Sequence, residues 1–269
     1  MNNNPHISIV TVCLNSAKTI RTTIESVLNQ TYDNYEYIIK DGGSKDDTIA
    51  IAKSYEEAVG GRLRIIQQPD GGIYDAMNQG INLCTGDIIG IINSDDFYSS
   101  DALENVAAEY AAEDTKLLVV IGDMERVSET GELIFRYHFT QEQVEKKSCF
   151  GHPSMFAAKA VYDRIGLYDT TYRLAADGDW QYRAMEDDEV KVVLCPKVFN
   201  HMREGGASDN PKYCWVWFKE RARMQLEHNR GSKFQIYSKE LWKMGKTYIK
   251  AVLPKRCKSL VYRMRYSPK

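Results

Sequence analysis

Aliphatic runs and helical patterns alternate along the first hundred residues. Short β-branched stretches, which predict buried strands, lie at residues 6–14, 35–41, 63–69 and 87–93. Segments with apolar side chains at helical spacing lie between them, at residues 16–29, 46–57 and 73–86, and Ser16 is a candidate N-cap. Strands that alternate with helices in this way predict a parallel sheet with helices on its faces. Ligands of such sheets bind beyond the carboxyl ends of the strands.

The pattern becomes mixed after residue 100. It predicts a strand at 116–123, a hairpin at 125–137 with its turn at Thr130–Gly131, an extended stretch at 149–158, a helix at 177–186 and two short strands at 191–196 and 197–202. From Pro211 onward helical patterns dominate. We therefore expect an α/β catalytic domain at residues 1–210, with a mostly parallel sheet, and a helical extension at residues 211–269.

Charge is distributed unevenly along this chain of 269 residues, whose net charge is −2. Residues 231–269 contain eleven Lys or Arg and one acid, Glu240, so a basic tail follows an acidic body. Within 241–253, apolar side chains such as Leu241 and Trp242 fall on one side of a helix, and Lys243, Lys246 and Lys250 fall on the other. Two interpretations stay open: a helix lying on an anionic membrane through residues 241–269, or one packed on the catalytic domain with its lysines in water.

Six cysteines show no spacing typical of a metal clip or a redox pair, which favours small buried thiols in a reducing compartment. The N-terminal sequence MNNNPHISIV lacks the pattern of a secretory signal, and no run reaches the ~18 apolar residues of a membrane span. We expect a cytoplasmic protein, with peripheral attachment to the inner face of the plasma membrane if the basic tail binds lipid.

Acidic side chains follow two of the predicted strands. In INSDDFY, Asp95 and Asp96 come directly after an aliphatic run, where they could bind Mn²⁺ or Mg²⁺ beside a diphosphate or could cap a helix. In KDGGSKDDT, Asp41 stands at a strand tip before a Gly–Gly turn, where it could accept the imide N–H of a uracil or could shape the turn. The fingerprints G-x-G-x-x-G and G-x-x-x-x-G-K-[ST] are absent, which disfavours dinucleotide binding and P-loop hydrolysis.

Three further segments carry candidate chemistry. In QPDGGIYDAMNQGI, Asp75 and Asn78 suit a sugar or phosphate site, although a solvated helix face has the same pattern. In LAADGDW, a carboxylate between apolar residues could serve as a general base. In FNHMREGGAS, His201 could complete a metal shell and Arg203 could close on phosphate, while His152 is either a buried imidazole or an acceptor contact.

Five motifs occur in one order: ISIVTVCLN, IIKDGGSKDDT, DGGIYDAMNQGI, TGDIIGIINSDD and ADGDW. In this order they resemble a family 2 glycosyltransferase with the GT-A fold, of the kind that builds bacterial surface polysaccharides, over roughly residues 5–210. The resemblance implies an inverting transfer of a sugar from a nucleotide sugar, most simply a UDP-sugar, to a glycan or lipid-linked glycan.

The resemblance also implies roles for single residues. Thr11, Asn15, Asp41, Asp46 and Asn93 would bind the nucleotide. Asp75, Asn78, Asp96 and Arg203 would meet the donor sugar or diphosphate, and Asp95 and His201 would hold the metal. Asp177 would be the general base, with His152, Asp179 and Trp180 at the acceptor. Asn93 stands where the family has the first acid of its Asp-x-Asp, so we expect weaker metal binding, not its loss.

Two other classes of function compete with this one. A sugar-1-phosphate nucleotidyltransferase would need a Gly-rich phosphate loop after the first strand, but SAKTIRTT contains no glycine. A non-catalytic scaffold would use the basic arm on an anionic surface and would leave Asp95, Asp96 and Asp177 unexplained. Nucleic acid is disfavoured as a partner because the acidic body would repel a polyanion.

Overall fold

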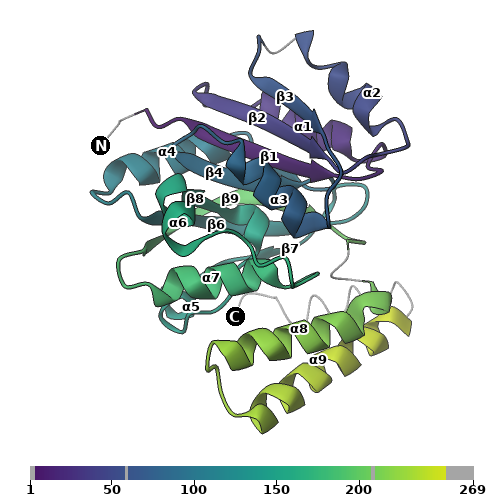
Figure 1. Ribbon diagram of the computed structural model, residues 1–269, viewed down its shortest axis with the longest axis vertical. Coiled ribbons are helices and arrows are strands. Elements are labelled where there is room, and N and C mark those ends of the chain that lie inside the picture. Colours follow the sequence, from purple (N-terminus) through teal and green to yellow (C-terminus); the bar gives the residue numbers. More distant parts are fainter. Residues whose placement is uncertain (1–3, 58–59, 207–209, 253–269) are drawn as a thin grey trace.

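The protein is built around one nine-stranded sheet with helices on both faces (Figure 1). The structure, a computed structural model, describes residues 4–57, 60–206 and 210–252, with side chains as far as Thr247. The strand order is β3-β2-β1-β4-β8-β6-β9-β5, and β7 pairs with β6 outside this path. Its mixed α/β architecture confirms the predicted fold class.

The first half of the sheet is parallel. It consists of β1 (Ile7–Cys13), β2 (Tyr35–Asp41), β3 (Leu63–Gln67) and β4 (Ile88–Asn93). Cys13 lies opposite Asp41, and Val12 lies opposite Asn93, so the carboxyl ends of three strands meet at one edge. β1, β2 and β4 are buried almost throughout, which explains their aliphatic sequences, whereas the edge strand β3 is mostly half-buried.

Helices α1 (Ile20–Leu28), α2 (Thr48–Lys53) and α3 (Ile73–Asn82) connect these strands. In Figure 1, α1 lies behind the sheet and α3 lies in front of it, as right-handed connections require when the chain crosses from β3 past β1 to β4. The predicted start of the first helix at Ser16 was wrong. The carbonyl of Ser16 accepts the N–H groups of Thr19 and Ile20 in a turn, and the helix begins at Ile20.

The second half of the sheet is mixed, not parallel. The strands are β5 (Phe97–Tyr98), β6 (Leu118–Val127), β7 (Leu133–Tyr137), β8 (Met155–Ala158) and β9 (Lys191–Arg203). β8 runs antiparallel to β4 and β6, whereas β9 runs parallel to β6. The two short strands predicted at 191–202 form one strand, because a register shift near Gly122 and Asp123 absorbs the irregularity.

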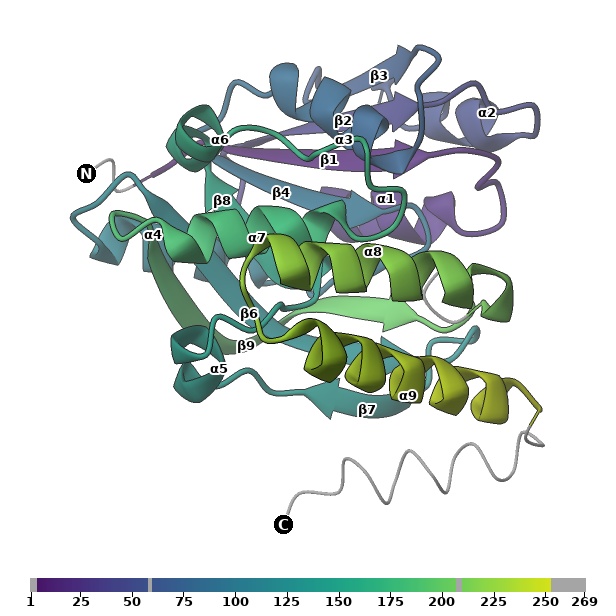
Figure 2. The same ribbon diagram turned by 60° about the horizontal axis from the view of Figure 1, so that its bottom comes forward.

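The remaining helices surround this second half. They are α4 (Ala102–Ala112), α5 (Gln141–Glu145), α6 (Lys159–Ile165), α7 (Ala176–Glu186), α8 (Cys214–Glu227) and α9 (Lys233–Val252), with 3-10 turns at His152–Ser154 and Pro211–Tyr213. A short loop joins α8 and α9 into an antiparallel hairpin, and α8 lies against α7 (Figure 2).

The inner side of helix α9 is mixed in character. Ile236 and Glu240 are each 2% exposed, and Glu240 forms ion pairs with Lys243 and with Arg221 of α8. Leu241 and Trp242, on the apolar face, are 47% and 61% exposed. These two apolar side chains are therefore not packed on the domain, and the choice between membrane contact and packing stays a prediction. The side chain of Lys250 and the basic residues from 255 onward lie outside the described part.

Within residues 4–57, 60–206 and 210–252, no helix combines the length and hydropathy that crossing a membrane requires.

Candidate active site

Asp41 stands at the tip of β2, where it organises the following turn. One carboxylate oxygen accepts the N–H groups of Gly43 and Ser44 at 3.0 Å each, and the other accepts the Ser44 hydroxyl at 2.5 Å. Gly43 has φ of 103°, which a side chain would strain. The Asp41 side chain is fully buried. It therefore shapes the loop and does not present a free oxygen to a nucleobase in this arrangement.

The loop after β1 is bonded to the same turn. The Asn15 side chain accepts the N–H of Lys45 at 2.9 Å. Asp46 accepts the N–H of Ala17 and the hydroxyl of Thr48. The bond from the Thr48 hydroxyl lowers the pKa of the Asp46 carboxyl. Thr11 is fully buried and its hydroxyl lies 2.9 Å from that of Tyr37. Asn15 and Asp46 thus lie on the loops at the sheet edge, whereas the Thr11 side chain lies inside the core.

The polar motif after β4 joins this edge through a hydroxyl pair. Ser94 Oγ lies 2.7 Å from Ser16 Oγ, which connects the ends of β1 and β4. Asp96 is 2% exposed, and its Oδ1 accepts the N–H of Arg203 at 3.1 Å. Burial, and then the neighbouring charge of Asp95, raise the pKa of Asp96 well above its ordinary value. The Arg203 guanidinium lies over the Phe97 ring at 5.3 Å, so β9 ends beside Asp96.

The residues at this edge fit a hard divalent cation. Asp96 Oδ2 and Asn93 Oδ1 are buried without a hydrogen-bond partner, next to the half-buried carboxylate of Asp95. Oxygen atoms of this kind suit Mg²⁺ or Mn²⁺, which keep waters and substrate phosphates as their remaining ligands. Nowhere in the described part of the chain do three or more His, Cys, Asp or Glu side chains form a metal-binding group. The protein therefore offers a partial shell that a diphosphate would complete.

His201 does not belong to that shell. Its Nδ1 lies 3.0 Å from Glu125 Oε2, its Nε2 lies 3.0 Å from Ser99 Oγ, and its ring stacks on Phe97 at 4.7 Å. Burial lowers the pKa of His201. Because both ring nitrogens have protein partners, this structure does not support the prediction that His201 ligates a metal.

Asp177 lies in the first turn of α7 and faces two residues from distant segments. Its Oδ1 accepts the hydroxyl of Tyr74 at 2.7 Å, and its Oδ2 lies 3.7 Å from Nδ1 of His152. Burial lowers the pKa of His152, while the charges of Asp177 and Asp95 act in the opposite direction. The charges of both carboxylates therefore act on the pKa of His152. Its Nε2 is buried without a partner among the described residues.

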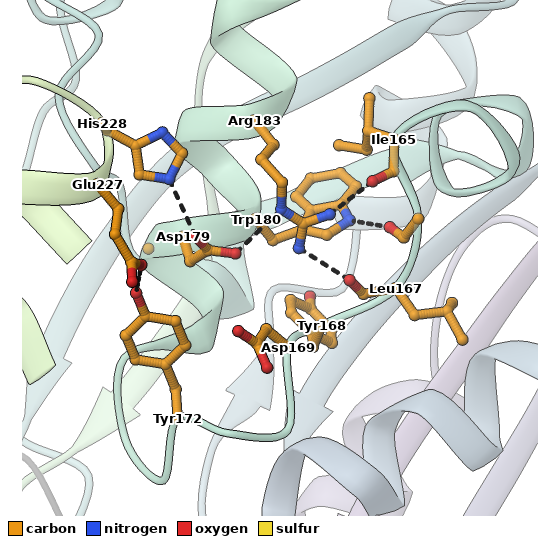
Figure 3. A network of polar contacts seen from close by, with 12 residues as sticks. Ile165, Leu167, Tyr168, Asp169, Tyr172, Asp179, Trp180, Arg183, Glu227 and His228 are labelled. Carbon is orange, nitrogen blue, oxygen red and sulfur yellow. Dashed lines mark hydrogen bonds and ion pairs between the residues drawn. The ribbon is translucent and has the colours of Figure 1, made fainter. Parts of the chain in front are cut away.

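Asp179 and Trp180 were wrongly predicted at the acceptor. Asp179 is bonded to Arg183 and to His228, each at 3.0 Å, in the network of Figure 3. Trp180 is fully buried; it donates to the carbonyl of Gly166 at 2.9 Å and packs on Tyr162 at 4.6 Å. Asp179, two positions after Asp177, points away from its face of the helix, whereas Trp180 is kept from the site by its burial in the core.

The motif DGGIYDAMN contributes a different residue from those predicted. Asp75 accepts the N–H of Gly71 and the Gln79 amide, which stabilises the start of α3. Asn78 exchanges two hydrogen bonds with the backbone of Tyr168, at 2.9 and 3.0 Å. The Asn78 amide is occupied by these backbone bonds, whereas Asp75 uses only Oδ2 in its two bonds, so a role of Asp75 at the donor sugar stays a prediction. The residue that reaches the site is Tyr74, which the sequence analysis did not select.

A long-range contact from α8 positions Asp177. The Glu220 carboxylate accepts the N–H groups of Arg173, Leu174 and Ala175, at 2.8 to 3.1 Å, immediately before α7. These groups would otherwise be unpaired at a helix start. No local motif marks Glu220 in the sequence, so this role could not be predicted.

A cavity of about 350 Å³ opens beside Asp177, between α7, α8 and α9. Arg221, Lys239 and Lys243 line it together with Asp177 and Trp217. It is the space next to the candidate base into which an acceptor could extend.

Comparisons with known proteins identify the family of this chain. The model of "Glycosyl transferase family 2" matches residues 8–164. A "PGL/p-HBAD biosynthesis glycosyltransferase" of Mycobacterium bovis is 33% identical over 207 residues, which cover 77% of this chain and 80% of the relative. This chain belongs to glycosyltransferase family 2.

Solved structures share the fold of this family 2 glycosyltransferase at low sequence identity. S. aureus TarS 1-349 in complex with UDP-GlcNAc has a TM-score of 0.62 and 18% identity, over 88% of this chain and 71% of that one. In a longer TarS chain the match covers 43% of its length, with a TM-score of 0.63 and 15% identity. A mannosyltransferase from Pyrobaculum calidifontis, in complex with GDP-Man and Mn²⁺, has a TM-score of 0.62 and 14% identity, over 99% and 77% of the two chains.

Proposed function

We propose that this glycosyltransferase transfers a hexosyl or N-acetylhexosaminyl group, with inversion, from a UDP-sugar to a hydroxyl of a glycan or lipid-linked glycan. The observation that carries the proposal is the position of His152. Its Nδ1 lies 3.7 Å from Asp177 Oδ2. Burial lowers its pKa while the charges of Asp177 and then Asp95 act to raise it, which supports one site shared by the candidate base and the candidate metal carboxylate. Two structural relatives, crystallised with UDP-GlcNAc and with GDP-Man and Mn²⁺, support a nucleotide-sugar donor.

The loops at the carboxyl edge of the parallel strands would hold the nucleotide. Asp41 shapes the turn, and Asn15 and Asp46 bond the neighbouring loops to one another. Asp95, Asp96 and the amide of Asn93 would hold Mn²⁺ or Mg²⁺, which would stabilise the negative charge on the departing nucleoside diphosphate. Arg203, beside Asp96, would contact the diphosphate.

Asp177 would deprotonate the acceptor hydroxyl. The Tyr74 hydroxyl fixes the direction of one carboxylate oxygen and leaves the other toward His152. The neutral form of His152, favoured by burial, can accept or donate a hydrogen bond to an acceptor sugar through its unpartnered Nε2. Attack from the face opposite the nucleotide would invert the anomeric centre.

The exposed apolar face of α9 supports a peripheral membrane contact. Phe234, Leu241 and Trp242 are 82%, 47% and 61% exposed, on a helix whose sequence belongs to the basic tail. We expect flotation with anionic phosphatidylglycerol vesicles at low salt, and reduced flotation of Trp242→Glu. Leu133→Glu is the matched control, because Leu133 is 58% exposed on β7. Recovery of all wild-type protein in the soluble fraction would contradict the contact.

A thermal-shift screen of nucleotide sugars, with and without Mn²⁺, tests the donor. A ligand at a concentration of about 100 times its Kd stabilises a protein by roughly 2.7 kcal/mol. UDP-sugars should therefore raise the unfolding midpoint by several degrees, and Mn²⁺ should add to the shift. Asp95→Asn should remove the Mn²⁺-dependent part. Asp101→Asn, at the start of α4 and without a capping bond from its side chain, is the control. If no nucleotide sugar shifts the midpoint, the proposed function is wrong.

A further inference from the structure

Positive charge gathers in the cavity beside Asp177. Arg221 of α8 and Lys239 and Lys243 of α9 line it together with one acid, Asp177, and Glu240 forms ion pairs with two of the three cations. Glu240 pairs with Arg221 at 3.4 Å and with Lys243 at 2.7 Å, whereas Lys239 has no ion pair within the described residues. Three cations thus face two carboxylates, one of which is the candidate base.

One acid is shared between two of these cations. Burial acts to raise the pKa of Glu240, but Arg221 and Lys243 outweigh it and the pKa is lowered. The pKa of Lys243 is lowered, first by burial and then by the charge of Arg221, despite its bond to Glu240. Because Glu240 pairs with both Arg221 and Lys243, and Lys239 has no ion pair within the described residues, the arrangement leaves positive charge that a bound anion would relieve.

An unpaired donor lies in the same wall. Trp217 lines the cavity, and its indole Nε1 is buried without a hydrogen-bond partner among the described residues. Indole N–H groups only donate, so the group suits an acceptor oxygen. Burying such a donor unpaired costs free energy, typically recovered when a ligand supplies the acceptor.

We propose that this cavity binds an anionic group of the acceptor, a phosphate or a carboxylate, and so holds the acceptor with its hydroxyl toward Asp177. The inference rests on the proposed function, because it takes Asp177 as the base. It names the class of acceptor: a phosphorylated or uronate-containing glycan, not a neutral one. The volume of about 350 Å³ falls within the range of small-molecule sites.

Isothermal titration of the full chain tests the charge preference, with glucose 6-phosphate, glucuronate and glucose as probes. We expect the anionic sugars to bind at least tenfold more tightly than glucose, and the stronger of the two to identify phosphate or carboxylate as the group. Equal affinity for all three probes would overturn the inference. This comparison needs no variant, so it does not depend on whether a mutant folds.

The variant Lys239→Gln tests whether the anionic group binds in this cavity. Because Lys239 is exposed at the residue level and has no ion pair in the described structure, the change should leave the fold intact and weaken the anionic probe about tenfold. Lys233→Gln makes the same charge change on the same helix outside the cavity, and should leave the affinity unchanged. Equal losses in the two variants would show a general effect of charge and overturn the assignment.

Saturating UDP separates this inference from the proposed function. The anionic probe should still bind with UDP present, and its displacement would assign the cavity to the donor and overturn the acceptor site. Donor hydrolysis with no anion binding would remove only this inference. Anion binding at Lys239 without any donor binding would remove the proposed function and leave an anion site without a glycosyl acceptor.

Discussion

The two sides of the proposed site hold their acidic side chains in different ways. At the edge of the parallel strands, Asp41 and Asp75 bond groups within four residues of themselves. Around α7, Asp177 bonds Tyr74, which lies 103 residues away, and Glu220 bonds backbone more than 40 residues away. Local turns thus hold Asp41 and Asp75, but the same edge also has distant contacts, since Asp46 accepts the N–H of Ala17, 29 residues away, and Asp96 accepts that of Arg203, 107 residues away. The contacts of Asp177 and Glu220 described above are all distant in sequence. Substitutions on the acceptor side should therefore distinguish most clearly between effects on kcat and effects on the free energy of unfolding.

Asp177→Asn should have the largest effect. Loss of a general base typically costs 10² to 10⁴ in rate, so kcat for nucleoside diphosphate release should fall by about that factor. Donor affinity and the unfolding midpoint should stay close to those of the wild type, because the amide can still accept the Tyr74 hydroxyl. A variant that retains more than about a tenth of wild-type kcat would exclude Asp177 as the base.

Asp179→Asn, two residues along the same helix, should show the opposite result: a loss of stability with little change in kcat. It removes the charge that Arg183 and His228 share in a nearly buried network, and breaking such a pair costs about 3 kcal/mol. Urea unfolding should show this loss. The kcat of the folded variant should stay within about threefold of wild type, and a loss as large as that of Asp177→Asn would return Asp179 to the acceptor site.

Glu240→Gln should destabilise the α8–α9 hairpin by about 2 kcal/mol at pH 7, because Lys243 and Arg221 are only partly exposed. The folded-state pKa of Glu240 is lowered, so its stabilisation is fully present above the unfolded pKa of about 4.3 and is lost as pH falls through the folded value. Unfolding curves of wild type and variant should therefore converge below about pH 4. A difference that stays constant with pH would show that the ionised carboxylate is not the stabilising form.

Glu220→Ala should cost about 1 to 2 kcal/mol, because water can replace part of its three backbone bonds at this partly exposed loop. Misplacement of α7 should also lower kcat several-fold with little change in donor affinity. Lys219→Gln, on the neighbouring exposed position of α8, is the control. Unchanged kcat in Glu220→Ala would show that α7 keeps its position without this contact.

Asn93→Asp tests the contribution of position 93 to the proposed metal site and should have the smallest effect. It adds a third carboxyl group to those of Asp95 and Asp96, which we expect to lower the Kd for Mn²⁺ in the presence of UDP by a few-fold. Without metal it should lower the midpoint slightly, because a further carboxylate would lie beside Asp96, whose pKa is already raised by burial and by the charge of Asp95. Titration of Mn²⁺ by calorimetry measures the first effect, and no change in Kd would show that position 93 does not contribute to the metal site.

Sequence patterns predicted the parallel strands, their helices and the turns at Gly43 and Gly131, because these features depend on neighbouring residues. They were less informative where partners are distant. Nothing in the sequence near Tyr74 shows that its hydroxyl meets Asp177, and nothing near Glu220 shows that it bonds the start of α7. Asp179 and Trp180 were misassigned because adjacency in sequence was taken for adjacency at the site, although Asp179 is two residues from Asp177 and points in a different direction, and Trp180 is buried in the core.

The hairpin of α8 and α9 has a mechanical consequence. Leu241 and Trp242 are exposed on α9, and Glu220 of α8 bonds the backbone just before α7. If α9 rests on a membrane and Asp177 is the base, as we propose, a force on α9 would be transmitted through α8 to the start of the helix that carries Asp177. Membrane attachment and alignment of the proposed base would then depend on the same two helices.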